Sequence, residues 1–338
     1  MRFVAKTLII LLCLTCFQAV RGASWVKQDA GTLAWLHDVY FLNEKKGWIV
    51  GSNGEFLFTG DGGRTWNKKK QFTEDTIREV HFFDEKNGWL LCERDIYSLG
   101  SDAPSYLLTT SDGGETWNTV NFTGDVRKRI TRIFFAGTDF GLAIGESGLI
   151  LSVQESGSVW KRMPSPAPYL LNDGMFINKE RGAIVGGGGT ILFTEDRGIT
   201  WKQSFVSSNA NTKLNSVFFL DERMAWAVGA NGNIYQTING GRVWRKQTTD
   251  VSANLTDIFF LDTAEGWAIG ENGTVLHSTT AGNVWTPSES KVKHKLEKIL
   301  FVGKSGWIVG FGGTVLFYEA GNVPDNSAKT APQIKRRN

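Results

Sequence analysis

A short glycine-flanked phrase recurs along this chain at an almost constant spacing. Most copies combine a glycine, three apolar residues and a second glycine, as in GWIVG at Gly47–Gly51. The steps between the seven copies are 41, 53, 41, 43, 41 and 40 residues. Self-similarity at a period of about 40 residues is typical of repeat architectures, so each period is expected to form one structural unit. The second residues of the copies are Trp48, Trp89, Leu142, Ala183, Trp226, Trp267 and Trp307.

Each period carries the pattern of four short β-strands. An apolar alternation precedes every copy, as in LHDVYF at Leu36–Phe41, and this period of two indicates a half-buried strand. A third strand follows the glycine turn, as at Glu55–Thr59, and a fourth starts at a recurrent tryptophan. Four strands per period predict an all-β fold, a seven-bladed β-propeller. The first strands are expected at 36–41, 77–82, 130–135, 171–176, 214–219, 255–260 and 296–301.

A second phrase, DGGRTW at Asp61–Trp66, precedes the fourth strand and recurs in weaker forms. Because a catalytic carboxylate is needed once and not in every blade, we interpret this box as structural. The aspartate can accept hydrogen bonds from its own turn, and the tryptophan can bury its ring between neighbouring sheets. The structural residues expected from the three best boxes are Asp61, Trp66, Asp112, Trp117, Asp196 and Trp201.

The seventh repeat lacks a box and therefore a fourth strand. The segment SWVKQ at Ser24–Gln28 resembles TWNKK at Thr65–Lys69, where a box tryptophan enters its strand. We expect this N-terminal strand to complete the last blade, because ring closure removes the unpaired sheet edges that promote aggregation. The second repeat has an insertion at about Glu93–Tyr106, which explains the 53-residue step.

The ends of the chain differ in composition from the repeats. Residues 1–22 have a short basic start and an apolar run and are predicted to be a signal peptide, with an uncleaved anchor as the alternative. Residues 23–320 then form the propeller, and 321–338 a disordered polar tail. Removing 1–22 leaves 34 basic and 34 acidic residues and only Cys92, which is expected to be buried in a strand. This balance gives no general attraction to nucleic acid.

The box S/T-x-D-x-G-x-T-W, paired with the glycine-flanked phrase, resembles the repeats of the photosystem II stability/assembly factor family of cyanobacteria and chloroplasts. The resemblance covers about Ser24–Phe317. It implies a non-enzymatic protein of the thylakoid lumen or periplasm that holds an assembly intermediate and carries an arginine-rich patch on one face. An exported protein of this kind could also be secreted into the medium. We expect the protein to be a monomer.

The first strand of each blade should line the central channel, with its start near one mouth. The second and third residues of these strands are then a candidate ring, either a polar binding mouth or an ordinary solvated rim. The ring comprises His37, Asp38, Arg78, Glu79, Thr131, Arg132, Asn172, Asp173, Asn215, Ser216, Thr256, Asp257, Glu297 and Lys298.

Two basic clusters precede first strands and should therefore reach the same rim, where they are either a binding surface or merely solvated. Arginine suits carboxylates because its planar fork contacts both oxygens. We predict that the rim binds a protein partner, through an acidic segment or the C-terminus of a membrane protein. The proposed binding residues are Arg78, Arg127, Lys128, Arg129, Arg132, Lys291, Lys293, Lys295 and Lys298.

Enzymatic readings find little support in the sequence. A sialidase-like glycoside hydrolase is the first alternative, but no arginine triad with a tyrosine nucleophile can be nominated. The four histidines show no metal-ligand spacing, so neither a metal nor a cofactor is expected. A second alternative is an exported carbohydrate- or peptide-binding propeller unrelated to photosynthesis.

Overall fold

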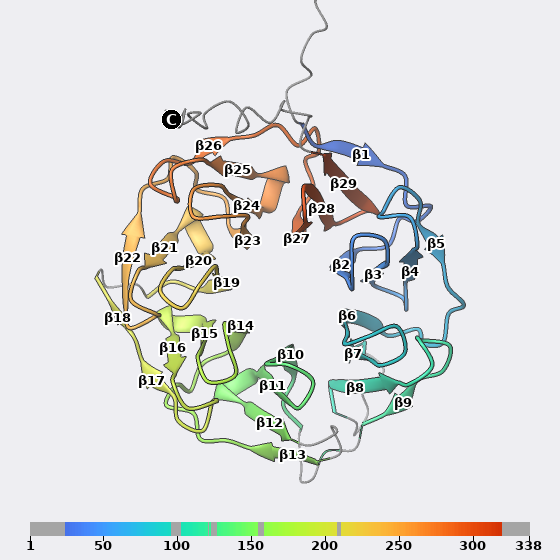
Figure 1. The fold of residues 1–338 in the computed structure, drawn as a ribbon, viewed down its shortest axis with the longest axis horizontal. Helices are drawn as coiled ribbons and strands as arrows, with labels where there is room; N and C mark the ends of the chain where they lie inside the picture. Colours follow the sequence, from blue (N-terminus) through green and yellow to red (C-terminus); the bar gives the residue numbers. More distant parts are fainter. Residues whose placement is uncertain are drawn as a thin grey trace, which may run out of the picture.

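The computed structural model describes residues 24–95, 103–120, 122, 127–154, 159–207 and 211–319, and these form a closed ring of seven sheets (Figure 1). Each sheet contains an antiparallel blade of four strands that runs from the channel outward, and the sheet of blade five has a fifth strand at its outer edge. The predicted seven-bladed β-propeller is therefore confirmed. The predicted signal peptide at 1–22 and tail at 321–338 lie outside the described residues, as does part of the blade-two insertion.

The strands occupy equivalent positions in every blade. The first strands, next to the channel, are β2 (Leu36–Phe41), β6 (Thr76–Phe82), β10 (Ile130–Phe135), β14 (Leu171–Phe176), β19 (Leu214–Phe219), β23 (Leu255–Phe260) and β27 (Leu296–Val302). The second strands are β3 (Gly47–Gly51), β7 (Gly88–Glu93), β11 (Phe140–Gly145), β15 (Gly182–Gly186), β20 (Ala225–Gly229), β24 (Gly266–Gly270) and β28 (Ser305–Gly310). The third strands are β4 (Phe56–Thr59), β8 (Ser105–Thr110), β12 (Ile150–Gln154), β16 (Ile191–Thr194), β21 (Ile234–Thr237), β25 (Val275–Ser278) and β29 (Thr314–Glu319).

Most outer strands are shorter, and they include the N-terminal one. They are β5 (Asn67–Lys68), β9 (Asn118–Thr119), β13 (Val159–Arg162), β17 (Lys202–Gln203), β22 (Val243–Gln247), β26 (Thr286–Pro287) and β1 (Val26–Gln28). Strand β1 pairs with β29, with Val26 opposite Phe317, and so completes the seventh blade as predicted. A further strand, β18 (Phe205–Val206), lies parallel to β22 at the outer edge of blade five.

The core is divided into seven clusters, one between each pair of neighbouring blades. In the cluster between blades one and two, Trp48 stacks on Phe82 with ring centroids 3.9 Å apart. The box tryptophans belong to these clusters: Trp201 shares one with Phe176 and with Leu142 of the preceding blade. Trp66 and Trp117 are only partly buried, but they also pack against the clusters. Burial of large rings between sheets therefore fixes each blade on its neighbour.

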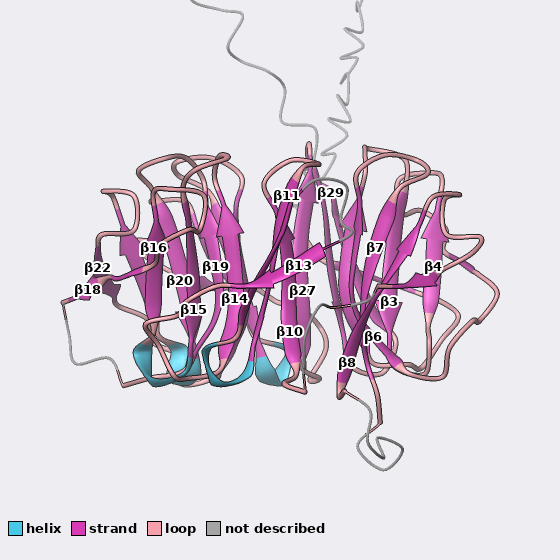
Figure 2. Ribbon diagram, turned by 90° about the horizontal axis from the view of Figure 1, so that it is seen from below, coloured by secondary structure: helices cyan, strands magenta, loops and turns pink. Residues whose placement is uncertain are grey.

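The two rims of the ring carry different turns. The lower rim of Figure 2 carries the turns between second and third strands, four of which are short 3-10 turns. These are η1 (Glu146–Gly148), η2 (Gly187–Gly189), η3 (Ala230–Gly232) and η4 (Glu271–Gly273). The first strands begin at the same rim, whereas the box loops lie at the upper rim beside the turns after the first strands. In the part of the chain that the structure describes, no helix is long and apolar enough to cross a membrane.

The box aspartates bond within their own turns, as the sequence predicts. Asp61 accepts hydrogen bonds from the Thr65 amide at 3.0 Å and from the Thr65 hydroxyl at 2.7 Å. Asp112 and Asp196 accept the same pair of bonds from Thr116 and Thr200. Hydrogen bonds from Thr65 lower the pKa of Asp61 to about 2, so the turn is held by a carboxylate that is ionised at neutral pH.

Candidate binding site at the channel mouth

A β-bulge interrupts every first strand at its second residue, or at its third in β6, which begins one residue earlier. In blade one, Leu36 pairs with Gly51 and Asp38 with Val50, so His37 is left over between them. A bulge turns two consecutive side chains toward the same side, and here both reach the channel. We call the seven left-over residues the bulge residues: His37, Arg78, Thr131, Asn172, Asn215, Thr256 and Glu297. The next residues are the belt residues: Asp38, Glu79, Arg132, Asp173, Ser216, Asp257 and Lys298.

The predicted ring therefore exists. All seven bulge residues and six of the belt residues line one pocket of about 150 Å³ in the channel.

The belt carboxylates join neighbouring blades. The Asp38 carboxylate of blade one accepts a hydrogen bond from the Val80 amide of blade two at 3.0 Å. The Glu79 carboxylate accepts one from the Ile133 amide of blade three at 2.8 Å. Asp173 and Asp257 accept equivalent amides, from Val217 and Ile299, at 2.9 Å. Each bond uses a buried backbone donor at the free inner edge of a first strand, which has no partner strand on the channel side, so the belt carboxylates stabilise the ring.

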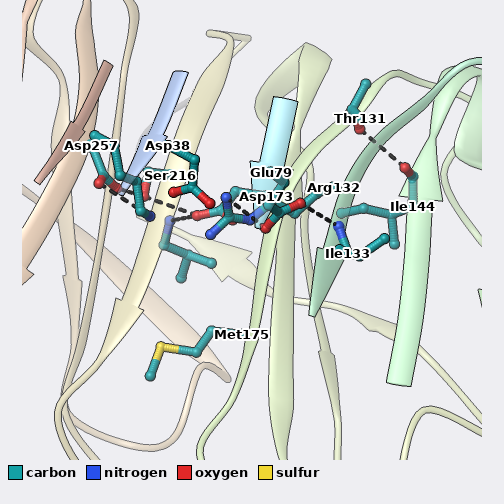
Figure 3. A network of polar contacts seen from close by, with 12 residues as sticks. Asp38, Glu79, Thr131, Arg132, Ile133, Ile144, Asp173, Met175, Ser216 and Asp257 are labelled. Carbon is teal, nitrogen blue, oxygen red and sulfur yellow. Dashed lines mark hydrogen bonds and ion pairs between the residues drawn. The ribbon is translucent and has the colours of Figure 1, made fainter. Parts of the chain in front are cut away.

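Arg132 and Lys298 belong to this belt and not to an open surface. Arg132 forms ion pairs with Glu79 at 2.9 Å and with Asp173 at 2.8 Å (Figure 3). The Lys298 ammonium lies 3.2 Å from Asp257. Both cations are thus committed to carboxylates inside the channel. Their positions in the sequence explain why they are paired there. Arg132 and Lys298 are the third residues of β10 and β27, so they point into the channel one residue deeper than the bulge residues at its mouth.

Burial shifts the ionisation of the belt and bulge residues. It raises the pKa of Glu79 to about 8 against the opposing effect of Arg132, and it also raises the pKa of Asp38. Burial, helped by the positive charges of Arg78 and Lys295, lowers the pKa of His37 to about 3. His37 is therefore neutral at pH 7, and its Nδ1 is 3.3 Å from the Arg78 guanidinium as an acceptor.

Outside the bulge residues, the lower rim widens into a depression of about 510 Å³, which we call the vestibule. Its cations are Arg78, Arg129, Lys213 and Lys295, and its carboxylates are Glu93, Glu271 and Glu297. Trp35, Leu170, Ala230 and the bulge asparagines and threonines supply much of the remaining wall. The vestibule thus combines charged, polar and apolar groups in one depression at the lower mouth.

The vestibule cations differ in how strongly they are already engaged. The Glu93 carboxylate forms ion pairs with the Arg78 guanidinium at 2.6 Å and with the Arg129 guanidinium at 3.3 Å. Arg129 also forms an ion pair with Glu146 at 3.2 Å. Lys295 pairs with Glu297 at 3.0 Å. Lys213 is exposed and forms no ion pair with another described residue. A carboxylate that enters the vestibule therefore meets the Lys213 ammonium, which has no ion pair with a described residue, and two arginines that both contact Glu93.

The structure brings together only part of the predicted basic rim. Arg78, Arg129 and Lys295 line the vestibule, and Arg132 and Lys298 lie deeper in the channel. The other four do not line either pocket: Arg127, Lys291 and Lys293 are exposed and Lys128 is half-buried. Sequence reasoning missed Lys213 and Trp35. Both immediately precede a first strand, as Arg129 and Lys295 do, so aligning the repeats at that position would have found them.

Cys92 is buried in β7, as predicted, and burial raises the pKa of its thiol to about 12. It is therefore not a nucleophile at neutral pH. Within the described residues, no three histidine, cysteine, aspartate or glutamate side chains are arranged to hold a metal ion.

Solved structures with the same fold come from proteins of different function. A structure described as YCF48 bound to D1 peptide is 22% identical, with a TM-score of 0.70 over 87% of this chain and 94% of that one. YCF48 from Cyanidioschyzon merolae is 18% identical, with a TM-score of 0.71 over 88% and 99%. Virginiamycin B lyase from Staphylococcus aureus reaches the same TM-score over the same shares at 10% identity. At these identities the likeness shows the fold alone.

Sequence comparison is more specific. No curated protein matches the chain significantly. A family described as Photosynthesis system II assembly factor YCF48 matches residues 17–97, 70–169, 165–238 and 236–323. These matches cover all seven blades, in agreement with the resemblance in the repeats. The chain therefore belongs to the Photosynthesis system II assembly factor YCF48 family.

Proposed function

We propose that this protein is an exported, non-enzymatic propeller that binds a protein partner during assembly, and that the vestibule receives a carboxylate-bearing peptide segment of that partner. The observation that carries the proposal is the gathering of four cations in one depression, with Lys213 unpaired among the described residues. Family membership supports a protein-binding role. The structural neighbour bound to D1 peptide supports a segment of a membrane protein as the partner.

The chemistry of the vestibule favours such a ligand. A peptide carboxylate can replace Glu93 as the acceptor of Arg78 or Arg129, because both arginines share that one glutamate. Lys213 and Lys295 add charge that attracts an acidic segment over a distance of about 10 Å at moderate salt. The ligand does not need to displace the belt, whose cations are committed to carboxylates inside the channel.

Charge reversal tests this function. We expect Lys213→Glu to weaken the binding of a short acidic peptide with a free C-terminus by about tenfold, and moderate salt to weaken wild-type binding. Fluorescence anisotropy with a labelled peptide measures both effects. Lys45→Glu is the matched control, because Lys45 is an exposed lysine in a turn of the opposite rim. Equal peptide affinity in both variants and the wild type would place the binding face elsewhere.

Arg132 is unsuitable for this test, since reversing its charge would leave Glu79 and Asp173 unpaired in the channel.

Export and the lack of an enzymatic activity are part of the same proposal. Export predicts a mature N-terminus near Ala23 or Ser24 in the periplasm, the thylakoid lumen or the medium, which mass spectrometry of the isolated protein can measure. A cytoplasmic full-length chain would contradict it. Turnover of sialosides by the wild-type protein would instead favour the glycoside hydrolase alternative.

A further inference from the structure

An exposed apolar patch adjoins the cations of the vestibule. Its centre is the ring pair of Trp35 and Phe311, and Leu33 lies in the adjoining segment whose backbone contacts the Phe311–Gly313 turn; we call these three residues, Leu33, Trp35 and Phe311, the shelf. Leu33 is 88% exposed and Phe311 46% exposed, whereas Trp35 is half-buried and lines the vestibule. The rings of Trp35 and Phe311 meet edge to face with centroids 5.5 Å apart. Large apolar side chains gathered on the surface beside a depression mark an interaction site.

The backbone holds the shelf in place. The Phe311 amide donates to the Lys295 carbonyl at 2.9 Å, and the Gly313 amide donates to the Ala34 carbonyl at 2.8 Å. A side chain on Gly313 would overlap the carbonyl of Thr32, so the segment that carries Leu33 lies directly on this turn. The shelf is therefore fixed by the contact between blades seven and one, and it is available before any ligand arrives.

Phe311 departs from the repeat. It is the first residue of the turn between the second and third strands. The corresponding residues of five other blades are small or charged: Ser52, Glu146, Gly187, Ala230 and Glu271. Packing between the blades does not need an aromatic ring here, because the other turns form without one. The exposed ring is thus a local addition to the rim.

The shelf and the cations form one surface. The Lys295 ammonium lies 5.3 Å from the centroid of the Trp35 ring. Lys295 and Trp35 line the same vestibule as Lys213 and Arg129. A ligand whose carboxylate pairs with Lys295 therefore places its neighbouring groups over the shelf, while Lys213 and Arg129 add positive charge elsewhere in the same depression.

We propose that the shelf binds a large apolar side chain of the same acidic peptide whose carboxylate the vestibule holds. This inference rests on the proposed function and adds a specificity to it: the partner segment carries a phenylalanine, leucine or similar residue close to its carboxylates. The positive charge beside the apolar surface favours this occupant over a purely apolar one. The shelf holds the apolar side chain of the peptide, and the cations set the direction in which the peptide crosses the channel mouth.

A pair of peptides tests the inference. The two are short, equally acidic and have free C-termini, and they differ only in a phenylalanine or a serine beside the acidic residues. We expect the wild-type protein to bind the phenylalanine peptide about tenfold more tightly, as measured by anisotropy. Leu33→Ser and Phe311→Ser should remove this preference and leave the affinity for the serine peptide unchanged. Phe205→Ser, at a 67% exposed phenylalanine of β18, is the matched control.

The outcomes separate the shelf from the vestibule. If both peptides bind the wild type equally and Lys213→Glu weakens both, the shelf inference is wrong and the proposed function stands. If neither peptide binds, the shelf inference and the proposed function are both wrong. If the wild type sediments as a dimer that Leu33→Ser makes monomeric, the occupant is a second copy of the chain and the inference is also wrong. Because Leu33 is almost fully exposed, its substitution leaves the fold intact.

Discussion

At the scale of the residue, the box aspartate organises a turn through its carboxylate oxygens. Blade five supplies a natural comparison, because Asn239 occupies this position and its side-chain oxygen still accepts the Val243 amide at 3.0 Å. One carbonyl oxygen thus suffices for the backbone bond. The second carboxylate oxygen of Asp61 accepts the bond from the Thr65 hydroxyl, which blade five lacks because a valine stands in place of that threonine.

Two substitutions at Asp61 separate these contributions. We expect Asp61→Ala to lower the free energy of unfolding by about 1 kcal/mol, because two turn amides lose their acceptor at a site that solvent partly screens. Asp61→Asn should cost less than half of that. Urea denaturation of both variants at pH 7 measures the difference. Equal losses would show that charge, and not the acceptor geometry, holds the turn.

At the scale of the element, β1 closes the ring with very few residues. Its contribution comes mainly from Trp25, immediately before the strand, which is 1% exposed. The Trp25 ring meets Trp267 of blade six at 5.4 Å and Tyr318 of β29 at 5.2 Å. The N-terminal segment therefore fixes blade seven to blade six by packing, in addition to its pairing with β29.

We expect Trp25→Ala to cost about 3–5 kcal/mol of stability, the range for removing a buried aromatic side chain. Val26→Ser is the control at the neighbouring position, since Val26 is 57% exposed, and it should change stability by less than about 0.5 kcal/mol. Thermal and urea unfolding can compare the two variants. Similar losses in both would mean that strand pairing, and not the buried ring, closes the propeller.

At the scale of the whole molecule, the belt connects the blades across the channel through carboxylates that are almost completely buried. The folded state favours the protonated form of Glu79, with a pKa of about 8, compared with about 4.3 in an unfolded chain. The contribution of this group to stability is therefore fully present below about pH 4.3 and is lost as the pH rises through 8.

The substitution Glu79→Gln tests this dependence. The stability of the wild type minus that of the variant should fall by about 1.4 kcal/mol per pH unit between roughly pH 5.5 and 7.5 and level off above pH 8. The buried histidines His37 and His81 are common to both proteins, so their opposite pH effects cancel in the difference. A difference that is constant or rises with pH would show that Arg132 keeps Glu79 ionised throughout.

The sequence by itself determined the architecture of this protein. A repeat of about 40 residues with four strand patterns leaves few folds available, and all seven first strands lie where the alternation predicts them, within one residue at the ends. The closing strand was predictable because Ser24–Gln28 resembles the start of a fourth strand while the seventh repeat lacks one. The turn role of Asp61 was predictable because its bonds are local in sequence.

Only the tertiary structure decided what each charged side chain does. Arg129 and Arg132 are three residues apart in one basic cluster, yet the first lines the open vestibule and the second is paired inside the channel. The bulge in β10 turns the Arg132 side chain into the channel. The partners of Arg132 there, Glu79 and Asp173, come from blades two and four, which are distant from it in sequence. Likewise, Trp35 and Phe311 lie at opposite ends of the chain and meet only because the ring closes. Local patterns fix strands and turns, whereas pairing between distant side chains depends on how the closed ring positions the blades.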